Sequence, residues 1–425
     1  MKLVLMAAGF GERLRPLSET RQKALMPILG EPIICRHLRN LSKVFTFDEI
    51  SIIISYKKEE VIEAVNKCFH GKVRFLVQEE PKGTGDAIKL AMESLGEGEY
   101  LIFYADVYLS TKGYSALANL ESPGIMITET KDYWNYGIVE LEDGIVKNIT
   151  EKPSFSEAKD KTIFAGALML DYDTKKYIDE IKKSPRGEFE ITDALKKMAN
   201  SMDIHTVNVG KYEWQDIGRP WELLISNRLA LNESKEKQEI LGDVDETVTI
   251  YGNVIIKKGS EIGKYSIIEG PAFIDENVKI GPMSHIRPYT VLMKGSKVGY
   301  SVEVKGSLIM ENAKLPHFNY VGDSIIGEGV NLGAGTITAN LRFDHEPIKM
   351  NIKGSPVNTG MEKLGAIVGG YSQTGINVSI LPGKKIGSFS IIYPGCVVYR
   401  DVKPHEVFKC NIKTLPKLKE LKTIT

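Results

Sequence analysis

The stretch MKLVLMAAGFGERLRPLSETRQKALMPILG, residues 1–30, places a cluster of cations directly after an apolar run. The run LVLMAA has the composition of a buried strand and stops at two glycines, Gly9 and Gly11. Arg13 and Lys23 follow. Glycines after a strand let backbone N–H groups approach a phosphate, and cations offset its charge. The stretch therefore predicts an anion site at the end of the first strand of an α/β sheet.

The Gly-x-Gly turn alone is weak evidence, because a tight strand-to-helix turn also needs glycine for its own conformation. A dinucleotide fingerprint would require a third glycine where this chain has Leu14, and the GK[ST] of a Walker loop is absent. The two cations at the edge where α/β sheets bind ligands favour a triphosphate.

Strand-like and helix-like segments alternate through residues 1–230. The strand-like segments are rich in branched and aromatic residues, and the segments between them carry apolar residues at helical spacing. Strand, helix and strand in succession predict parallel pairing in a doubly wound, Rossmann-like α/β sheet. We expect strands at 2–8, 51–55, 73–78 and 100–106, and helices at 32–45, 57–69 and 84–95.

From about residue 245 the apolar period changes to six. A period of six predicts a triangular coil of short parallel strands, in which each hexad forms one side and points one branched side chain inward. The period slips at 311–325 and breaks again across 339–364. Slips predict loops, which carry function more often than the elements they connect. The aliphatic series is Ile250, Ile256, Ile262, Ile268, Ile274, Ile280, Ile286, Leu292, Val298 and Val304.

The change of period predicts two domains. The first covers residues 1–230, and a charged stretch then makes 231–247 the expected linker. The repeat domain is expected at 248–410, followed by a tail at 411–425.

The composition excludes several classes of partner. Among 425 residues, 55 basic and 55 acidic side chains cancel, so neither nucleic acid nor a membrane surface is the expected main partner. Cys35, Cys68, Cys396 and Cys410 lie far apart without a CxxC pair, which supports neither a disulfide framework nor a cysteine-rich metal site. No apolar stretch suggests a signal peptide or a membrane span. These features predict a cytoplasmic protein.

Two aspartates follow strand-like runs at the same expected edge of the sheet. Asp106 ends YLIFYAD, and Asp216 follows the strand-like run 204–209 within WQDIGRP. Either aspartate alone could simply cap a turn. Two of them beside cations favour Mg²⁺, which prefers one or two carboxylates together with phosphate oxygens.

The motifs LMAAGFGERLRPL, RQKALMPILG, PKGTGDA, FYADV, ITEKP, GEFEITD and WQDIGRP resemble, in this order, those of the sugar-1-phosphate nucleotidylyltransferases. In that family a sugar-1-phosphate oxygen attacks the α-phosphate of a nucleoside triphosphate and pyrophosphate leaves. The resemblance implies Mg²⁺, UTP or dTTP, and a sugar-1-phosphate as ligands. A single methyl group separates UTP from dTTP, so the choice between them stays open.

The resemblance also implies roles for individual residues. Arg13 and Lys23 would be the catalytic cations, and Asp106 and Asp216 would hold Mg²⁺. No nucleophile or general base is expected from the protein, because the acceptor phosphate is already ionised. The nucleotide would contact Gly9, Gly11, Gln78, Gly83 and Thr84, and the sugar phosphate would contact Gly137, Glu151, Lys152 and Gly166.

The repeat domain has two possible explanations, a trimer-forming stalk or a second catalytic domain. The stretch KLPHFNYVGDSIIGEGVNLGAGTITAN, residues 314–340, falls at the first slip, so His317 and Tyr320 are expected to be exposed. This stretch is similar to the acetyltransferase domain of the bifunctional enzymes that make UDP-N-acetylglucosamine. That resemblance implies a left-handed β-helix, a homotrimer and acetyl-CoA as co-substrate.

In the resembled family a histidine deprotonates the amine of glucosamine-1-phosphate, and His317 is its counterpart. Imidazole titrates at about 6.5 when unperturbed, which suits a general base. The family pattern ends after Asn340, so Lys349 is assigned here with Lys353 as the alternative. The acetyl acceptor would contact Arg287, Lys305, Tyr320, Asn331, Asn340 and Lys349, while Ala334 and Gly370 would face acetyl-CoA.

The sequence thus predicts a bifunctional enzyme of nucleotide-sugar synthesis, similar to archaeal homologues with two activities. One alternative is a glucose-1-phosphate thymidylyl- or uridylyltransferase whose β-helix only forms trimers. Another is a non-catalytic regulatory subunit, against which the intact Arg13, Lys23, Asp106 and Asp216 argue.

Overall fold

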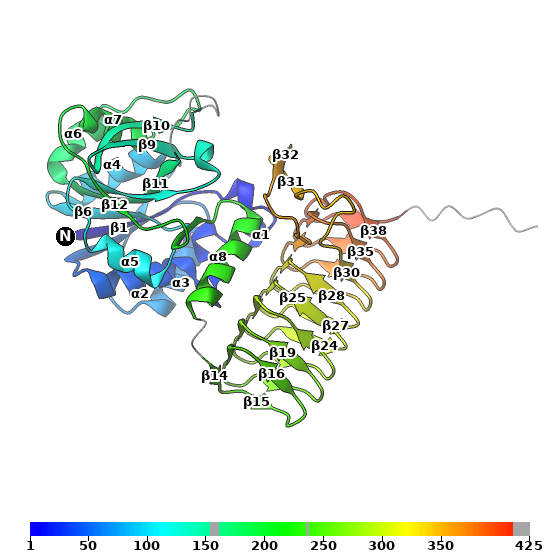
Figure 1. The fold of residues 1–425 in the computed structure, drawn as a ribbon. Coiled ribbons are helices and arrows are strands. Elements are labelled where there is room, and N and C mark those ends of the chain that lie inside the picture. The colour runs from blue at the N-terminus through cyan, green and yellow to red at the C-terminus, as the bar shows by residue number, and fades with distance from the viewer. Residues whose placement is uncertain (154–160, 235–237, 411–425) are drawn as a thin grey trace, which may run out of the picture.

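The computed structural model describes residues 1–153, 161–234 and 238–410. An α/β unit is followed by a long β-helix that lies beside it (Figure 1). The predicted fold class, a doubly wound α/β domain followed by a parallel β-helix of hexapeptide repeats, is confirmed. Its coils are consistent with the left-handed sense that the resemblance implies.

The central sheet of the α/β unit has the strand order β10-β9-β11-β6-β1-β4-β5, with β8 beside β11 and β12 beside β8. β1 pairs in parallel with β4 and β6, whereas β11 runs antiparallel to β6, so the sheet is mixed. The strands are β1 Lys2–Ala7, β4 Glu49–Ile54, β5 Arg74–Val77, β6 Glu99–Tyr104, β8 Gly124–Glu129, β9 Gly137–Glu142, β10 Ile145–Glu151, β11 Thr162–Asp171 and β12 His205–Asn208.

Successive residues of the central strands belong to different apolar clusters. Leu3 and Leu5 pack in one cluster with α2 and α3, and Val4 packs in the other with α4 and α7. Because side chains alternate along a strand, this division shows that helices cover both faces of the sheet. The helices are α1 Leu17–Thr20, α2 Ile33–Val44, α3 Lys58–Cys68, α4 Thr84–Leu95, α5 Thr111–Leu117, α6 Lys175–Asp179, α7 Ile191–Ala199 and α8 Pro220–Glu233.

A disulfide joins Cys35 of α2 to Cys68 at the end of α3, although the wide spacing of the cysteines did not support a disulfide framework. The two residues lie 33 positions apart in sequence, but their helices pack on the same face and bring the Cα atoms to 6.0 Å. Spacing alone cannot reveal such a contact. Cys396 and Cys410 are free thiols. Disulfides are rare in the cytosol outside hyperthermophiles, so the cytoplasmic location stays a prediction.

The repeat domain winds through three flat sides, as the period of six predicts. Side one comprises β14 Glu239–Ile240, β17 Val254–Ile256, β20 Ala272–Ile274, β23 Thr290–Leu292, β26 Leu308–Ile309, β29 Ile325–Ile326, β33 Ile367–Val368 and β36 Lys385–Ile386. Side two comprises β15 Asp243–Val244, β18 Glu261–Ile262, β21 Lys279–Ile280, β24 Lys297–Tyr300, β27 Lys314–His317, β34 Gln373–Thr374, β37 Ile391–Ile392 and β39 Val407–Phe408. Side three comprises β16 Thr249–Tyr251, β19 Ile267–Glu269, β22 His285–Ile286, β25 Glu303–Lys305, β28 Tyr320–Gly322, β30 Ile337–Thr338, β35 Ser379–Ile380 and β38 Val397–Val398. The predicted aliphatic series from Ile256 to Val304 is buried inside the coil.

The first slip of the period does not interrupt the coil, contrary to expectation. Leu292 pairs with Ile309, and Val298 pairs with Leu315, so the coil here is one residue shorter than in the preceding turns. The stretch 314–340 therefore stays within the coil, because a corner absorbs the missing residue. The second break, 339–364, contains a hairpin of β31 Lys349–Ile352 and β32 Ser355–Asn358 outside the coil.

The junction is shorter than the linker predicted at 231–247. α8 ends at Glu233, and β14 and β15 already pair with the next coil. The predicted tail, 411–425, lies outside the described residues.

Side one packs its outer face against the α/β unit. Its outward residues stand in register and form one apolar cluster with side chains of the first unit, including Leu14, Trp221 and Leu224. α8 is apolar on more than one face because it lies between the two units (Figure 1). The outward ladder consists of Ile255, Phe273, Val291, Leu308, Ile325 and Ile367.

Polar contacts join the β-helix to the segment between the first glycines and Lys23. The guanidinium of Arg21 donates to both carboxylate oxygens of Glu311, at 3.0 and 2.6 Å. Lys353 at the hairpin tip pairs with Glu12 at 2.5 Å. Glu19 accepts the backbone N–H of Ser388 at 2.7 Å. The β-helix thus supports this segment from outside.

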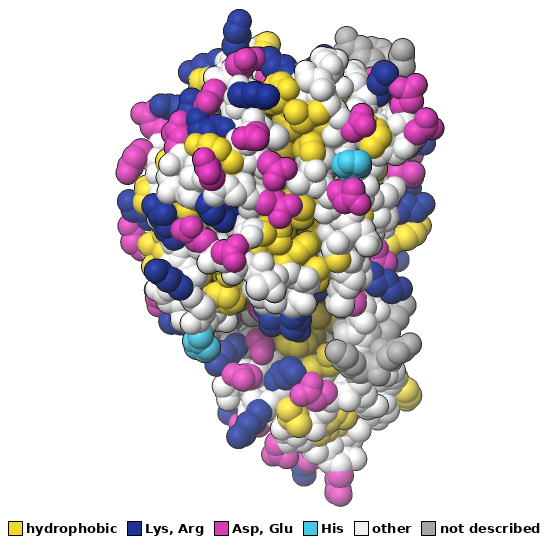
Figure 2. Space-filling view, turned by 90° about the vertical axis from the view of Figure 1, so that its left-hand side faces the viewer, with side chains coloured by type: hydrophobic (Ala, Val, Ile, Leu, Met, Phe, Trp, Pro, Cys, Tyr) yellow, Lys and Arg dark blue, Asp and Glu magenta, His cyan; other side chains and the backbone are white. Residues whose placement is uncertain are grey.

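The surface carries both signs of charge. Lys and Arg are interspersed with Asp and Glu over the face of the molecule shown in Figure 2. Among the helices of residues 1–153, 161–234 and 238–410, none is both long and apolar enough to cross a membrane.

Candidate functional site

The first candidate site begins where β1 ends. Gly11 adopts φ 67°, a left-handed conformation that favours glycine, and starts the short 3₁₀ helix Glu12–Leu14. A Cβ at Gly9 would meet nothing within 4 Å, so the backbone there is open to a ligand. This geometry fits the close approach of a phosphate that the sequence predicts.

Two adjoining hollows gather most of the predicted residues. The first, of about 240 Å³, and the second, of about 290 Å³, share Thr84, Tyr104, Asp106 and Glu188. Gly11 packs against Ser18 and Lys23 instead of lining either hollow. The first is lined by Arg13, Lys23, Thr84, Asp106, Gly137, Glu151, Lys152, Gly166 and Asp216, and the second by Gly9, Gln78, Gly83 and Thr84.

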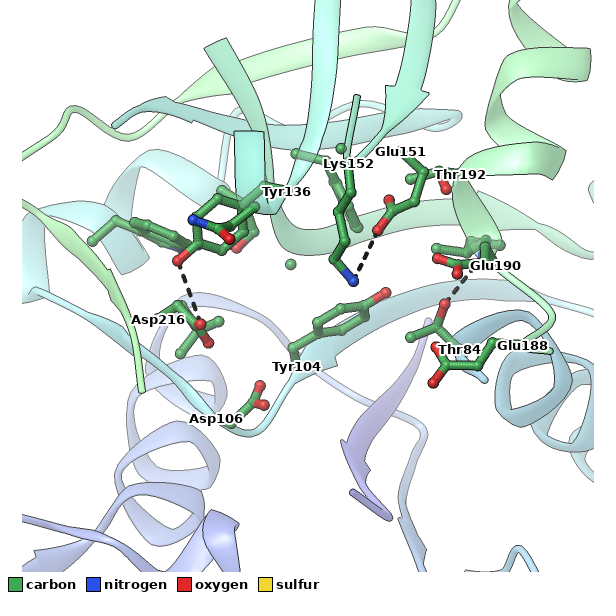
Figure 3. Close-up of a pocket in the computed structure, with 18 of the residues that line it drawn as sticks. Thr84, Tyr104, Asp106, Tyr136, Glu151, Lys152, Glu188, Glu190, Thr192 and Asp216 are labelled. Atoms are coloured by element: carbon green, nitrogen blue, oxygen red, sulfur yellow. Dashed lines mark hydrogen bonds and ion pairs between the residues drawn. The ribbon is translucent and has the colours of Figure 1, made fainter. Parts of the chain in front are cut away.

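Asp106 and Asp216 lie at one end of the first hollow (Figure 3). The strands β7 Val107–Leu109 and β13 Trp214–Asp216 pair antiparallel and place Asp216 opposite Val107. Lys23 forms an ion pair with Asp106, and the Tyr136 hydroxyl donates to Asp216 at 3.4 Å. A small two-stranded sheet therefore sets both carboxylates at the same edge.

The cations at this edge stay charged although they are buried. Burial opposes the charge of Lys23, but the carboxylates of Asp106 and Asp216 raise its pKa above the usual value. Burial likewise opposes the charge of Arg13, and Asp216 and Glu222 raise its pKa. The site thus holds fixed positive charge beside two acids.

Glu222 lies behind this edge and supports it. Burial, followed by the repulsion from Asp216, raises the pKa of Glu222 well above the range of an ordinary carboxyl. Its Oε2 accepts the backbone N–H of Gly218 at 2.8 Å and of Arg219 at 2.6 Å. These bonds fix the turn that follows Asp216.

The two aspartates fit a magnesium ion that also binds substrate oxygens. The described residues contain no group of three or more His, Cys, Asp or Glu side chains that could hold a metal alone. Mg²⁺ commonly uses one or two carboxylates, with water and phosphate oxygens as its remaining ligands. Asp106 and Asp216 supply that donor set.

The other end of the hollow is rich in carboxylates (Figure 3). Glu151 pairs with Lys152 at 3.3 Å, and Arg186 pairs with Glu190 at 2.7 Å. Burial, with a further contribution from Glu190, raises the pKa of Glu151. A Cβ at Gly137 would lie 3.1 Å from Oε2 of Glu151, so a side chain there would crowd this carboxylate. Hydrogen-bond acceptors at this end suit a sugar hydroxyl.

Several residues that line this hollow had no predicted role. Glu188, Glu190 and Thr192 belong to GEFEITD, one of the motifs on which the family resemblance rests, although no site residue was predicted within it. Tyr104 precedes Asp106 in FYADV, and Tyr136 precedes Gly137. Thr84 was predicted, and its hydroxyl accepts the backbone N–H of Ile191 at 3.1 Å.

His317 occupies an exposed corner between sides two and three, which confirms its predicted exposure. Its backbone N–H donates to Oδ1 of Asn319 at 3.3 Å, and its carbonyl accepts the N–H of Gly335 at 3.2 Å. The half-buried Ala334 therefore lies in the coil next to His317.

Four of the predicted acetyl-acceptor residues meet on side three. Arg287 pairs with Glu303 at 2.8 Å, and Lys305 pairs with Asp323 at 3.0 Å. Asn340 donates to Asp323 at 2.6 Å and to the Tyr320 hydroxyl at 3.3 Å. The parallel register of side three brings these residues from different coils onto one face.

Three other predicted residues lie elsewhere. The backbone of Asn331 forms isolated β-bridges with Lys314 and Gln373 on side two. Lys349 is exposed on the hairpin. Gly370 is buried between the units, where an added Cβ would lie 3.0 Å from both Glu328 and Thr20. The structure therefore does not bring Gly370 to a face open to acetyl-CoA, because the first unit covers it. Of the two candidate lysines, Lys353 pairs with Glu12, whereas Lys349 has no ion pair among the described residues.

Comparison with known proteins agrees with the division of the chain into two units. The family model "Nucleotidyl transferase" matches residues 2–233, and the "GMPPB C-terminal domain" matches residues 268–369. A bifunctional sugar-1-phosphate nucleotidylyltransferase/acetyltransferase of Sulfurisphaera tokodaii is 43% identical, over 96% of this chain and all of that protein. The bifunctional protein GlmU of Methanocaldococcus jannaschii is 40% identical over 99% of this chain and all of that protein.

Proposed function

The chain belongs to the nucleotidyl transferase family, and to those members that also carry an acetyltransferase, and on this premise we propose that it catalyses both reactions. The first unit transfers a uridylyl or thymidylyl group to a sugar-1-phosphate and releases pyrophosphate. The β-helix transfers an acetyl group from acetyl-CoA to glucosamine-1-phosphate. The convergence of Arg13, Lys23, Asp106 and Asp216 on one hollow carries the first assignment.

The first reaction requires alignment of two anions that repel each other. Arg13 and Lys23 bind the triphosphate at the open backbone of Gly9, and Lys152 binds the sugar phosphate. Glu151 and neighbouring carboxylates orient the sugar hydroxyls. Mg²⁺, when bound by Asp106 and Asp216, supplies charge that stabilises the transferred and departing phosphates.

The second reaction requires a base for the amine. His317 takes the proton from the amino group, which then attacks the thioester carbonyl of acetyl-CoA and displaces the thiolate. Arg287 and Lys305 hold the acceptor phosphate. The exposure of His317 and the grouping of side-three residues support this assignment.

The acetyltransferase site is completed by neighbouring copies in a homotrimer. A single chain leaves Asn331 and Lys349 away from side three. The corner between sides two and three carries exposed apolar side chains suited to contact with another copy, namely Tyr265, Met283, Tyr300 and Phe318. Light scattering after size-exclusion chromatography is expected to give three chain masses, and a monomer would contradict this assembly.

Two assays test the proposed function. We expect pyrophosphate release from UTP or dTTP with a panel of sugar-1-phosphates and Mg²⁺, and free thiol from acetyl-CoA with glucosamine-1-phosphate. Release of pyrophosphate without release of thiol would indicate that the β-helix serves only as a scaffold. The absence of both products would support a regulatory subunit.

Replacing Arg21 by Met is expected to lower nucleotidyl transfer by about tenfold, because small misplacements of a phosphate-binding group have large effects on rate. Arg21 stands two residues before Lys23, and its bidentate contact with Glu311 fixes that segment against the β-helix. Pyrophosphate release at saturating substrates measures the change.

Arg39→Met is the matched control, since Arg39 forms an exposed ion pair with Glu31 within the first unit. Glu311→Gln should reproduce part of the loss. Equal rates for Arg21→Met and Arg39→Met would show that the contact with the β-helix does not position Lys23.

A further inference from the structure

Asp323 is a buried carboxylate that cations of both units share. It directly follows strand β28 of side three and is 3% exposed. Its oxygens accept from Nζ of Lys305 at 3.0 Å, from Nδ2 of Asn340 at 2.6 Å and from Nη2 of Arg228 at 2.6 Å. Lys305 and Asn340 are predicted acetyl-acceptor residues, whereas Arg228 belongs to α8 of the nucleotidyltransferase unit.

The packing of α8 aims Arg228 at the β-helix. Leu224 and Leu231, one turn to either side, lie in the apolar cluster between the units. Nε of Arg228 is buried and lacks a hydrogen-bond partner among the described residues. A Cβ at Gly306 would lie 2.7 Å from Oδ1 of Asp323 and 3.1 Å from Nη2 of Arg228, so glycine leaves room for this ion pair.

A hollow of about 450 Å³ opens beside this group at the boundary of the units. The side chains of Arg228 and Lys305 are 31% and 25% exposed, whereas that of Asp323 is 4% exposed. The cations thus face the hollow and the carboxylate is covered. Lys363 and Glu362 line the same hollow.

We propose that Arg228 is a binding residue of the acetyltransferase site and that, together with Lys305, it holds the phosphate of the acetyl acceptor. This inference rests on the proposed acetyl transfer. Asp323 offsets the repulsion between the two cations and fixes their positions, and one net positive charge remains toward the hollow. A phosphate dianion is the chemistry that this pair of donors recognises. The nucleotidyltransferase unit is therefore part of the acetyltransferase site.

The test is the Michaelis constant of the acceptor in Arg228→Met, which keeps the apolar stem of the side chain and removes its charge. We expect KM for glucosamine-1-phosphate to rise about tenfold, as for loss of a charge-assisted hydrogen bond. KM for acetyl-CoA should stay within twofold, inorganic phosphate should compete less well, and Arg228→Lys should restore part of the affinity.

Arg36→Met is the matched control, because Arg36 pairs with Glu233, the last residue of α8, and neither residue lines this hollow. Pyrophosphate release by each variant reports that the first unit is folded. If the wild type transfers acetyl groups and Arg228→Met raises both KM values alike, or changes only kcat, the inference is overturned. If the wild type releases no thiol from acetyl-CoA, the proposed acetyl transfer itself fails.

Discussion

Replacing Asp106 by Asn is expected to reduce nucleotidyl transfer by about 10²–10³-fold, the typical effect of removing one well-placed charged group from such a site. The substitution keeps the shape of the side chain and removes one of the two carboxylates that the paired strands β7 and β13 bring to the same edge. It also removes the partner of Lys23, whose charge burial opposes. Lys23 would then lose its proton at a lower pH. The pH profile should therefore lose activity on its alkaline side earlier than in the wild type.

Acetyl transfer by the same variant should stay within twofold, because His317 and the side-three residues lie on the other unit. Asp171→Asn is the matched control, since Asp171 accepts an exposed hydrogen bond from Ser122 at the far end of β11. An Asp106→Asn variant with wild-type pyrophosphate release would remove the first proposed reaction. Equal loss of both activities would mean that the two sites are coupled in a way that the contacts between the two units do not explain.

Local periodicity was sufficient to predict both architectures. The aliphatic series from Ile256 to Val304 specifies the coil, because each hexad repeats the same inward position. Asp106 could be placed at one edge of the α/β sheet because it follows β6. Asp216 reaches the same edge as the last residue of β13, a short strand that was not predicted. The function proposed for that edge rests on the resemblance of the motifs. The role of each residue there stays a prediction.

The features that escaped prediction are contacts between distant segments. Arg21 and Glu311 are separated by most of the chain, and neither position has a local pattern that indicates the other. The disulfide between Cys35 and Cys68 depends on the packing of two helices. Gly370 was assigned to acetyl-CoA on the resemblance alone, and its contact with Thr20 of the first unit has no local sequence pattern. Contacts of this kind follow from the arrangement of the units, which sequence spacing does not specify.

The slip near residue 311 shows a different limit. A missing residue in a repeat predicts either a loop or a shortened corner, and both give the same sequence pattern. The structure has the shortened corner, so His317 stands on a rigid coil instead of a loop. A base held on a rigid element keeps its geometry without ordering a loop when the substrate binds.

Replacing His317 by Ala is expected to reduce acetyl transfer by about 10²–10⁴-fold, the range associated with loss of a general base. The imidazole stands at an exposed corner, one coil from Ala334, where it can meet an amine from solvent. Thiol release from acetyl-CoA at saturating substrates measures the change.

His405→Ala tests whether any corner histidine has this effect, because His405 is also exposed at a left-handed corner and stacks on Phe389 with ring centroids 5.1 Å apart. That variant should retain acetyl transfer, and both variants should retain pyrophosphate release. A fall in kcat that is confined to His317→Ala supports His317 as the base. A higher KM for glucosamine-1-phosphate at unchanged kcat would indicate a binding role instead, and an unchanged rate would exclude His317 from the reaction.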